Sequence, residues 1–245
     1  QPEQPDGATM ISHADFALYR AKQRGKSAFE YFDEEMNRER LDRKAIEADL
    51  MQALAKDQFA LHYQPKLTAV SGEVTGAEAL IRWVHPELGM IPPDKFIPIA
   101  ESLGVIKEMS AWVLKQACAQ HIAWRDSGLP SIPISVNLSA VQFRDGMLVS
   151  TIRDITSEHK ISPQMIELEI TESAIIDRIE DVRRQLSELH SLGYKLCIDD
   201  FGTGYSSLAY LSRFSIDVLK IDRTFIADVT DKSESATITK AIITM

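Results

Sequence analysis

The sequence is poor in cysteine and has no long apolar run. Only Cys118 and Cys197 occur among 245 residues, each inside an apolar stretch. Two such residues predict reduced core side chains of a cytosolic protein rather than a disulfide framework. No uninterrupted apolar run approaches the roughly 18 residues of a membrane helix, and no signal peptide is present. These absences predict a cytoplasmic chain, with any inner-membrane anchor of a parent protein lying outside these residues.

Basic residues are also in deficit. The chain has 27 Lys and Arg against 36 Asp and Glu, a formal net charge of -9. Proteins that bind duplex nucleic acid carry a basic excess, so no duplex partner is expected. An anionic ligand stays compatible with this balance if metal ions or a few local cations screen the repulsion. The 6 histidines show neither H-x-x-H nor H-x-x-x-H spacing, which argues against zinc.

The chain divides into three predicted parts. Residues 1–33 contain an amphipathic helix stopped near Gly25 and a short strand at 28–32, too little to bury a core, so we expect the tail of a preceding domain. Residues 34–56 alternate in charge, which favours an exposed connecting helix. The remaining residues, 57–245, form the main domain.

The main domain opens with a predicted hairpin. "QFALHYQPKLT" alternates in polarity and "VTGAEALIRW" returns as a second strand. Further strands are expected at 132–137, 165–171, 195–199 and 218–221, with helices at 105–127, 147–159 and 179–192. This repetition predicts a parallel sheet covered by helices, in a barrel or a doubly wound sheet. The absence of G-x-G-x-x-G favours a barrel, whose chemistry lies at the carboxyl ends of its strands.

Each of the five predicted parallel strands carries a polar side chain that we expect in its carboxyl-terminal part. These residues are Glu78 and Arg82, then Asn137, then Glu169 and Glu172, then Asp199 and Asp200, and finally Lys220 and Asp222. A single aspartate at a strand end usually starts a turn or caps a helix. The same placement on five strands in succession predicts a functional site.

Oxygen donors dominate this set. Carboxylate and amide oxygens are the ligands that Mg²⁺ and Mn²⁺ prefer, and they are supplied by Glu78, Asn137, Glu169 and Asp199. Asp199 and Asp200 repel each other unless divalent cations neutralise them, so Asp199 could bridge two ions while Asp200 binds the second. The alternative is that Asp200 caps a helix beginning near Ser206.

Two basic residues complete the predicted site. Lys220 could orient a water molecule, or accept its proton if its pKa is lowered; the alternative is a salt bridge to Asp222 or Glu169. Arg82 lies four residues beyond Glu78 on the same strand face, about 13 Å along. Its planar guanidinium suits phosphate oxygens.

Taken together, the motifs resemble those of the EAL domain family, bacterial phosphodiesterases of cyclic di-GMP. The resemblance covers residues 57–245 and rests on "EAL" at 78 followed by "IRW", "NLS" at 137, "ELEITES" at 167, "DDFGTGYSSL" at 199 and "LKID" at 219. The segment "ADFALYRAKQRGKSAFEYF" resembles the last helix and strand of a GGDEF domain. The resemblance thus implies a GGDEF–EAL tandem protein, with sensor domains further upstream and a possible homodimer.

The family implies a TIM-like (β/α)₈ barrel with an antiparallel first strand, and hydrolysis of cyclic di-GMP to linear pGpG with two Mg²⁺ or Mn²⁺ ions. By resemblance, the metal ligands are Glu78, Asn137, Glu169, Asp199 and Asp200. Lys220 would orient or deprotonate the attacking water. Glu172 would fix the flap, the loop at 201–208 that follows Asp200. Arg82 would contact substrate phosphate, and Gln64 and Tyr205 would contact substrate or flap.

One departure and two alternatives accompany this prediction. Six strands are predicted where a barrel needs eight, so we expect a truncated barrel, or one completed by a partner, and a poor catalyst in isolation. A receptor that binds cyclic di-GMP without cleaving it is one alternative. A scaffold or dimerisation module acting through 34–56 and 201–208 is the other.

Overall fold

The computed structural model describes residues 6–24, 29, 31–32, 34–144, 146–176, 179–202, 214–227 and 233–244. Its strands are β1 Phe59–Leu67, β2 Val74–His85, β3 Gly89–Ile91, β4 Ile134–Leu138, β5 Ile166–Thr171, β6 Lys195–Phe201 and β7 Val218–Ile221. Its α-helices are α1 Gly7–Arg24, α2 Glu34–Ala53, α3 Pro93–Leu103, α4 Ile106–Asp126, α5 Leu148–Glu158, α6 Glu172–Ile176, α7 Ile179–Ser191, α9 Arg223–Ala227 and α10 Ser233–Ile243. Among these helices, none combines the length and apolar composition that crossing a bilayer requires.

The strands form one mixed sheet in the order β1-β2-β4-β5-β6-β7, with β3 paired to β2. β1 runs antiparallel to β2, and the strands from β2 through β4, β5 and β6 to β7 pair in parallel. The predicted TIM-like arrangement with an antiparallel first strand is confirmed. Over the described residues the sheet is not closed into a ring, since β1 and β7 lie at opposite ends of this order.

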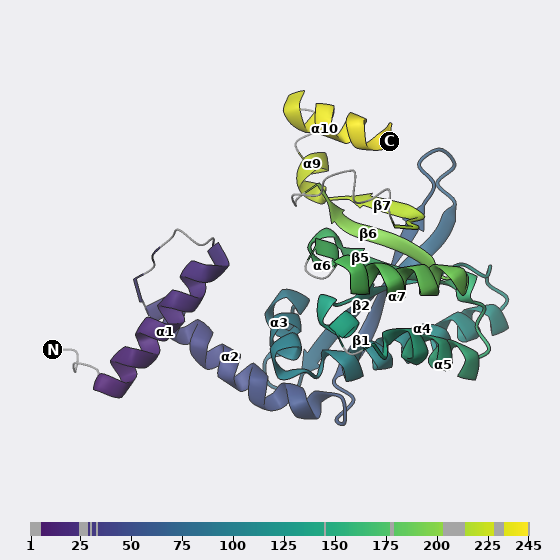
Figure 1. Cartoon of the computed structure of the whole chain (residues 1–245). Coiled ribbons are helices and arrows are strands. Elements are labelled where there is room, and N and C mark those ends of the chain that lie inside the picture. The colour runs from purple at the N-terminus through teal and green to yellow at the C-terminus, as the bar shows by residue number, and fades with distance from the viewer. Residues whose placement is uncertain are drawn as a thin grey trace.

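Helices α4, α5 and α7 cover one face of the sheet (Figure 1). Strand alternation directs Val136 of β4 and Leu168 and Ile170 of β5 toward these helices. Leu114 of α4 and Leu186 of α7 belong to the same buried cluster. This outer face is the main hydrophobic core, and it fixes the direction in which the opposite face of each strand points.

A second cluster joins α2 to the first hairpin. Ile46 and Leu50 of α2 are buried with Phe59, Trp83 and Phe96. The rings of Trp83 and Phe96 meet edge to face, with centroids 5.6 Å apart. The carboxyl-terminal half of α2 therefore packs on the main domain, which corrects the expectation that this helix is exposed along its length.

Further differences from the sequence prediction are local. β3 and α3 were not predicted, because β3 has only three residues and Pro98 lies inside α3, where proline disfavours a helix. The short strand expected at 28–32 is wrong for the described residues Phe29, Tyr31 and Phe32, which lie outside any strand.

Candidate active site

The inner face of the sheet is polar along its middle strands. Ser135 and Asn137 alternate with outward apolar residues on β4, and Glu167 and Glu169 do so on β5. Asn137 and Glu169 are direct partners in the β4–β5 register. The strand-end pattern in the sequence therefore corresponds to one continuous inner surface.

Lys220 lies at the centre of this surface. Its Nζ donates hydrogen bonds to Glu78 Oε2 at 3.1 Å, to Glu169 Oε2 at 2.6 Å and to Asp199 Oδ2 at 2.8 Å. The four side chains come from β2, β5, β6 and β7. The structure thus brings together residues separated by up to 142 positions in the sequence.

The charge state of Lys220 follows from these contacts. Burial alone lowers the pKa of its ammonium, but the hydrogen bonds to Asp199 and Glu169 and the charges of Glu169 and Glu78 outweigh it, so the pKa lies well above its ordinary value. The predicted alternative, a salt bridge to Glu169, is confirmed as one part of this cluster. Lys220 is a cation among three carboxylates.

The carboxylate oxygens lie close enough together to hold a divalent metal ion. Ligand oxygens of Glu78, Glu169 and Asp199 all lie within 4.8 Å of one another. All three are hard oxygen donors, which suit Mg²⁺ and Mn²⁺. Asn137 donates its amide N–H to Glu78 Oε1 at 3.0 Å, so a cation would be held by its carboxamide oxygen. This donor set fits the predicted ions.

Asp200 extends the acidic cluster. Its backbone adopts φ 54°, and its N–H donates to Asp199 Oδ1 at 2.9 Å. Burial, followed by the negative charges of Asp199 and Asp222, raises the pKa of its carboxyl group. A second cation would relieve this repulsion. The alternative role, capping a helix near Ser206, falls outside the described residues.

Glu172 fixes the backbone just after the paired aspartates. Its carboxylate is 2% exposed and accepts a hydrogen bond from the Gly202 N–H at 2.8 Å. Gly202 has φ 102°, and a Cβ there would lie 2.8 Å from the Phe225 ring. Glycine is therefore required at this contact. Tyr205, in the loop that follows, lies outside the described residues.

Arg82 and Gln64 lie beside the cluster. Arg82 lines a cavity of about 450 Å³ together with Asn137 and Ser173, and its Nη1 donates to the Ile81 carbonyl at 2.9 Å. Gln64 is exposed and faces Glu78 in the β1–β2 register. The cavity therefore adjoins the acidic cluster through Asn137.

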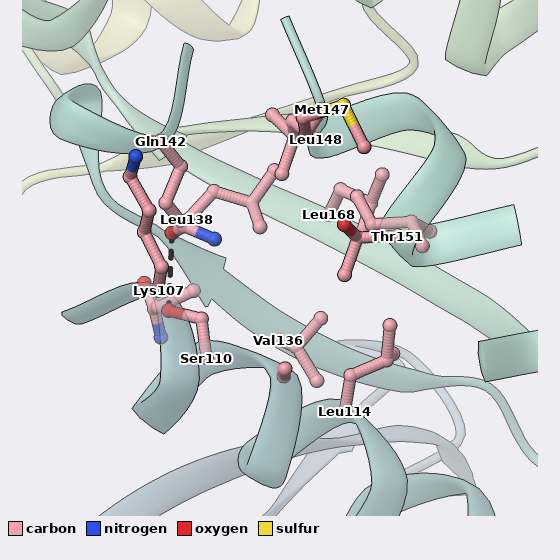
Figure 2. Close-up of a pocket in the computed structure, with 13 residues that line it drawn as sticks. Lys107, Ser110, Leu114, Val136, Leu138, Gln142, Met147, Leu148, Thr151 and Leu168 are labelled. Carbon is pink, nitrogen blue, oxygen red and sulfur yellow. Dashed lines mark hydrogen bonds between the residues drawn. The ribbon is translucent and has the colours of Figure 1, made fainter. Parts of the chain in front are cut away.

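A smaller cavity of about 60 Å³ lies on the other side of the strands, between α4, α5 and the β4–β5 pair. Ser110 donates a hydrogen bond to Gln142 at 3.1 Å at one end, and Leu114, Val136 and Leu168 line the rest (Figure 2). Its walls are mainly those of the apolar core. We interpret it as a packing gap rather than part of the site.

Lys66 was not predicted from the sequence as part of this site, and neither were its partners Ser135 and Glu167. Lys66 comes from β1, and its Nζ contacts Ser135, Glu167 and Glu169 on the same inner face. The available signal was its spacing from Gln64, two residues earlier on an alternating strand.

Fold and site define a chain of the α/β barrel class that carries an acidic cluster on the inner face of its parallel strands. The sequence profile of the EAL domain family matches residues 47–245. The chain therefore belongs to the EAL domain family.

Individual relatives agree with this assignment. The chain is 41% identical to the "Bifunctional diguanylate cyclase/cyclic di-GMP phosphodiesterase MucR" of Pseudomonas aeruginosa, over 98% of this chain and 36% of that protein. It is 38% identical to the "Cyclic di-GMP phosphodiesterase PdeR" of Escherichia coli, over 97% of this chain and 36% of that protein. It thus spans little more than a third of the length of these curated relatives.

A solved structure described as "PaMucR Phosphodiesterase, c-di-GMP complex" superposes with a TM-score of 0.78 at 44% identity, covering 82% of this chain and 81% of that one. The EAL enzyme Bd1971, in a form bound to cAMP and cyclic di-GMP, superposes with a TM-score of 0.77 at 29% identity, over 98% of this chain and 63% of that one.

Proposed function

We propose that this chain forms the catalytic part of a phosphodiesterase that hydrolyses one phosphodiester bond of cyclic di-GMP, giving linear pGpG. The observation that carries the proposal is the bonding of Lys220 to Glu78, Glu169 and Asp199 on the inner face of the sheet. Relatives of 38–41% identity are named as cyclic di-GMP phosphodiesterases, which supports the same substrate.

Two Mg²⁺ or Mn²⁺ ions are the proposed cofactors. Their ligands would be Glu78, Asn137, Glu169, Asp199 and Asp200. When bound, such ions supply a water of lowered pKa and neutralise charge that develops on the phosphate. The mutual approach of the carboxylate oxygens to within 4.8 Å supports this role.

The remaining side chains bind and orient. Lys220, which bonds three of the carboxylates, would hold these groups in place and orient or deprotonate the attacking water. Arg82, from the edge of the adjoining cavity, would contact a substrate phosphate. Glu172 would hold the start of the flap through Gly202. Gln64 and Tyr205 would make further substrate or flap contacts.

The surrounding architecture is also a proposal. We assign residues 1–33 to the end of a GGDEF domain, 34–56 to a connecting helix and 57–245 to the phosphodiesterase domain of a cytoplasmic signalling protein. The burial of Ile46 and Leu50 gives the connecting helix a firm contact with that last domain. Upstream sensor domains and a homodimer would complete the parent protein.

The test is hydrolysis of cyclic di-GMP by the full-length natural protein, followed by chromatography of pGpG. Product should form with Mg²⁺ or Mn²⁺, stop with a chelator and be lost in Glu78→Ala. Glu87→Ala is the matched control, because Glu87 is an exposed carboxylate just beyond the same strand. Binding of cyclic di-GMP without any cleavage would refute the enzyme and favour a receptor.

A further inference from the structure

Lys66 reaches the acidic cluster by an unusual route. It lies on β1 opposite Gly76 of β2 in the antiparallel register. A Cβ at Gly76 would lie 3.2 Å from the Pro133 carbonyl oxygen and 3.8 Å from Lys66 Cδ. The lysine side chain therefore passes within van der Waals distance of this position, whereas the tight contact that a Cβ would make is with the Pro133 carbonyl.

Beyond Gly76, the ammonium contacts two further strands. Its Nζ donates to Ser135 Oγ of β4 at 2.6 Å, to Glu167 Oε1 of β5 at 2.5 Å and to Glu169 Oε1 of β5 at 2.7 Å. β1 and β5 are three strand spacings apart, about 14 Å in a flat sheet. The contact depends on the curvature that brings the inner side chains together.

Glu167, Glu169 and Cys197 form a second group whose ligand atoms lie within 4.8 Å of one another. A metal is not needed to explain it, because the Lys66 ammonium bonds both carboxylates. Burial, with added effects of the neighbouring charges, also raises the pKa of the Cys197 thiol, which disfavours the thiolate form that a metal requires.

Glu169 is held from both sides. Lys66 bonds its Oε1, and Lys220 bonds its Oε2 at 2.6 Å. The Glu169 side chain is 0% exposed, whereas those of Lys66 and Lys220 are 28% and 27% exposed. A fully buried carboxylate requires paired charges and hydrogen bonds on its oxygens. Lys66 supplies these on the side away from Glu78 and Asp199.

We propose that Lys66 is a positioning residue that fixes Glu169, directing Oε2 toward Glu78, Asp199 and Lys220. This inference rests on the proposed function in taking Glu169 as a ligand of a divalent ion. A divalent ion competes with Lys220 for the same oxygens, whereas Lys66 bonds the other oxygen of Glu169. Lys66 therefore keeps Glu169 oriented when its contact with Lys220 changes.

Charge and orientation predict opposite effects of removing Lys66. By Coulomb attraction alone, losing a nearby positive charge strengthens the binding of a cation. Losing the hydrogen bond that orients a ligand weakens metal binding, typically by about 10- to 100-fold. The direction of the change in Mn²⁺ affinity therefore distinguishes a positioning residue from a mere counter-charge.

The experiment measures Mn²⁺ affinity by electron paramagnetic resonance and stability by chemical unfolding, in the full-length protein. Lys66→Met leaves Glu167 without its ammonium partner and Glu169 with Lys220 alone, and it should lower stability. Lys66→Met combined with Glu167→Gln removes one charge of each sign and should restore much of it. Glu78→Gln identifies the part of the Mn²⁺ signal that comes from this site.

We expect Mn²⁺ to bind about 10- to 100-fold more weakly both in Lys66→Met and in the double variant. We also expect kcat to fall at saturating Mn²⁺ while KM for cyclic di-GMP changes little. Mn²⁺ affinity that is unchanged or tighter in Lys66→Met would overturn the proposal. Recovery of Mn²⁺ affinity together with stability in the double variant would also overturn it, because Lys66 would then only balance charge.

The same measurements separate this inference from the proposed function. If Lys66→Met weakens Mn²⁺ binding at the Glu78-dependent site but the unaltered protein never cleaves cyclic di-GMP, Lys66 still positions Glu169. The proposed hydrolysis alone would then be wrong.

Discussion

The two faces of β5 differ sharply in chemistry although both are buried. On β5, Leu168 and Ile170 point outward and Glu169 points inward, and all three are 0% exposed. The outer residues pack on helices, whereas Glu169 is enclosed by Lys66 and Lys220. Strands of parallel barrels are usually apolar on both faces, so the inner face departs from what folding alone would select.

The difference in energetics indicates which face serves function. Burying an outer leucine contributes about 1.5–3 kcal/mol to stability. Burying an ion pair gains little over packed apolar residues, while breaking one costs about 3–5 kcal/mol. The arrangement of Glu78, Glu169 and Asp199 around Lys220 is therefore explained better by the proposed chemistry than by stability.

The largest effect should come from the centre of the inner face. Lys220→Met should lower turnover of cyclic di-GMP by about 10²–10⁴-fold, the usual range for a group that orients or transfers protons. Mn²⁺ should still bind, because the ammonium that competes for the carboxylate oxygens is gone. Steady-state kinetics and Mn²⁺ titration measure the two effects, and loss of both together would contradict this role.

Substitutions on the outer face should lower stability rather than turnover. Leu168→Ala removes a fully buried side chain and should cost about 2–5 kcal/mol of unfolding free energy, measured by urea denaturation. Mn²⁺ affinity of the folded protein should change little. Leu129→Ala, at a residue that is 54% exposed, is the control and should be nearly neutral. A large loss of Mn²⁺ affinity in Leu168→Ala would show that the faces are not independent.

A smaller effect concerns pH. Burial, only partly offset by the hydrogen bond between its Nδ1–H and the Ile132 carbonyl, lowers the pKa of His121 on α4. Below about pH 6.5 the unfolded chain takes up a proton that the folded chain resists. Stability should therefore fall on acidification through and below that pH, by at most about 1.4 kcal/mol per pH unit from this group.

The comparison for His121 is with His121→Gln, which cannot titrate. When the pH is lowered from 7.5 to 5.5, the protein with His121 should lose more unfolding free energy than the His121→Gln variant. Parallel pH profiles would show that His121 does not contribute.

Much of the inner face could be predicted from the sequence because β4, β5, β6 and β7 each carry a polar residue near the carboxyl end. Lys66 was not predicted from this pattern, and the reason lies in the sheet topology. β1 is antiparallel, so its carboxyl end, where Lys66 lies, meets the beginning of β2. A rule that follows the carboxyl ends of parallel strands does not reach it. β3 was not predicted because three residues are too few to show an alternating pattern. α3 was not predicted because Pro98 lies inside it and proline disfavours a helix.

A crystal structure with Mn²⁺ and cyclic di-GMP would test directly whether the inner face is a metal-dependent catalytic site. Anomalous scattering would locate the Mn²⁺ ions. We expect Mn²⁺ among the oxygens of Glu78, Asn137, Glu169, Asp199 and Asp200, with the dinucleotide extending toward Arg82. Dinucleotide bound without Mn²⁺, while Lys220 keeps its three carboxylate partners, would contradict the claim that the inner face is a metal-dependent catalytic site.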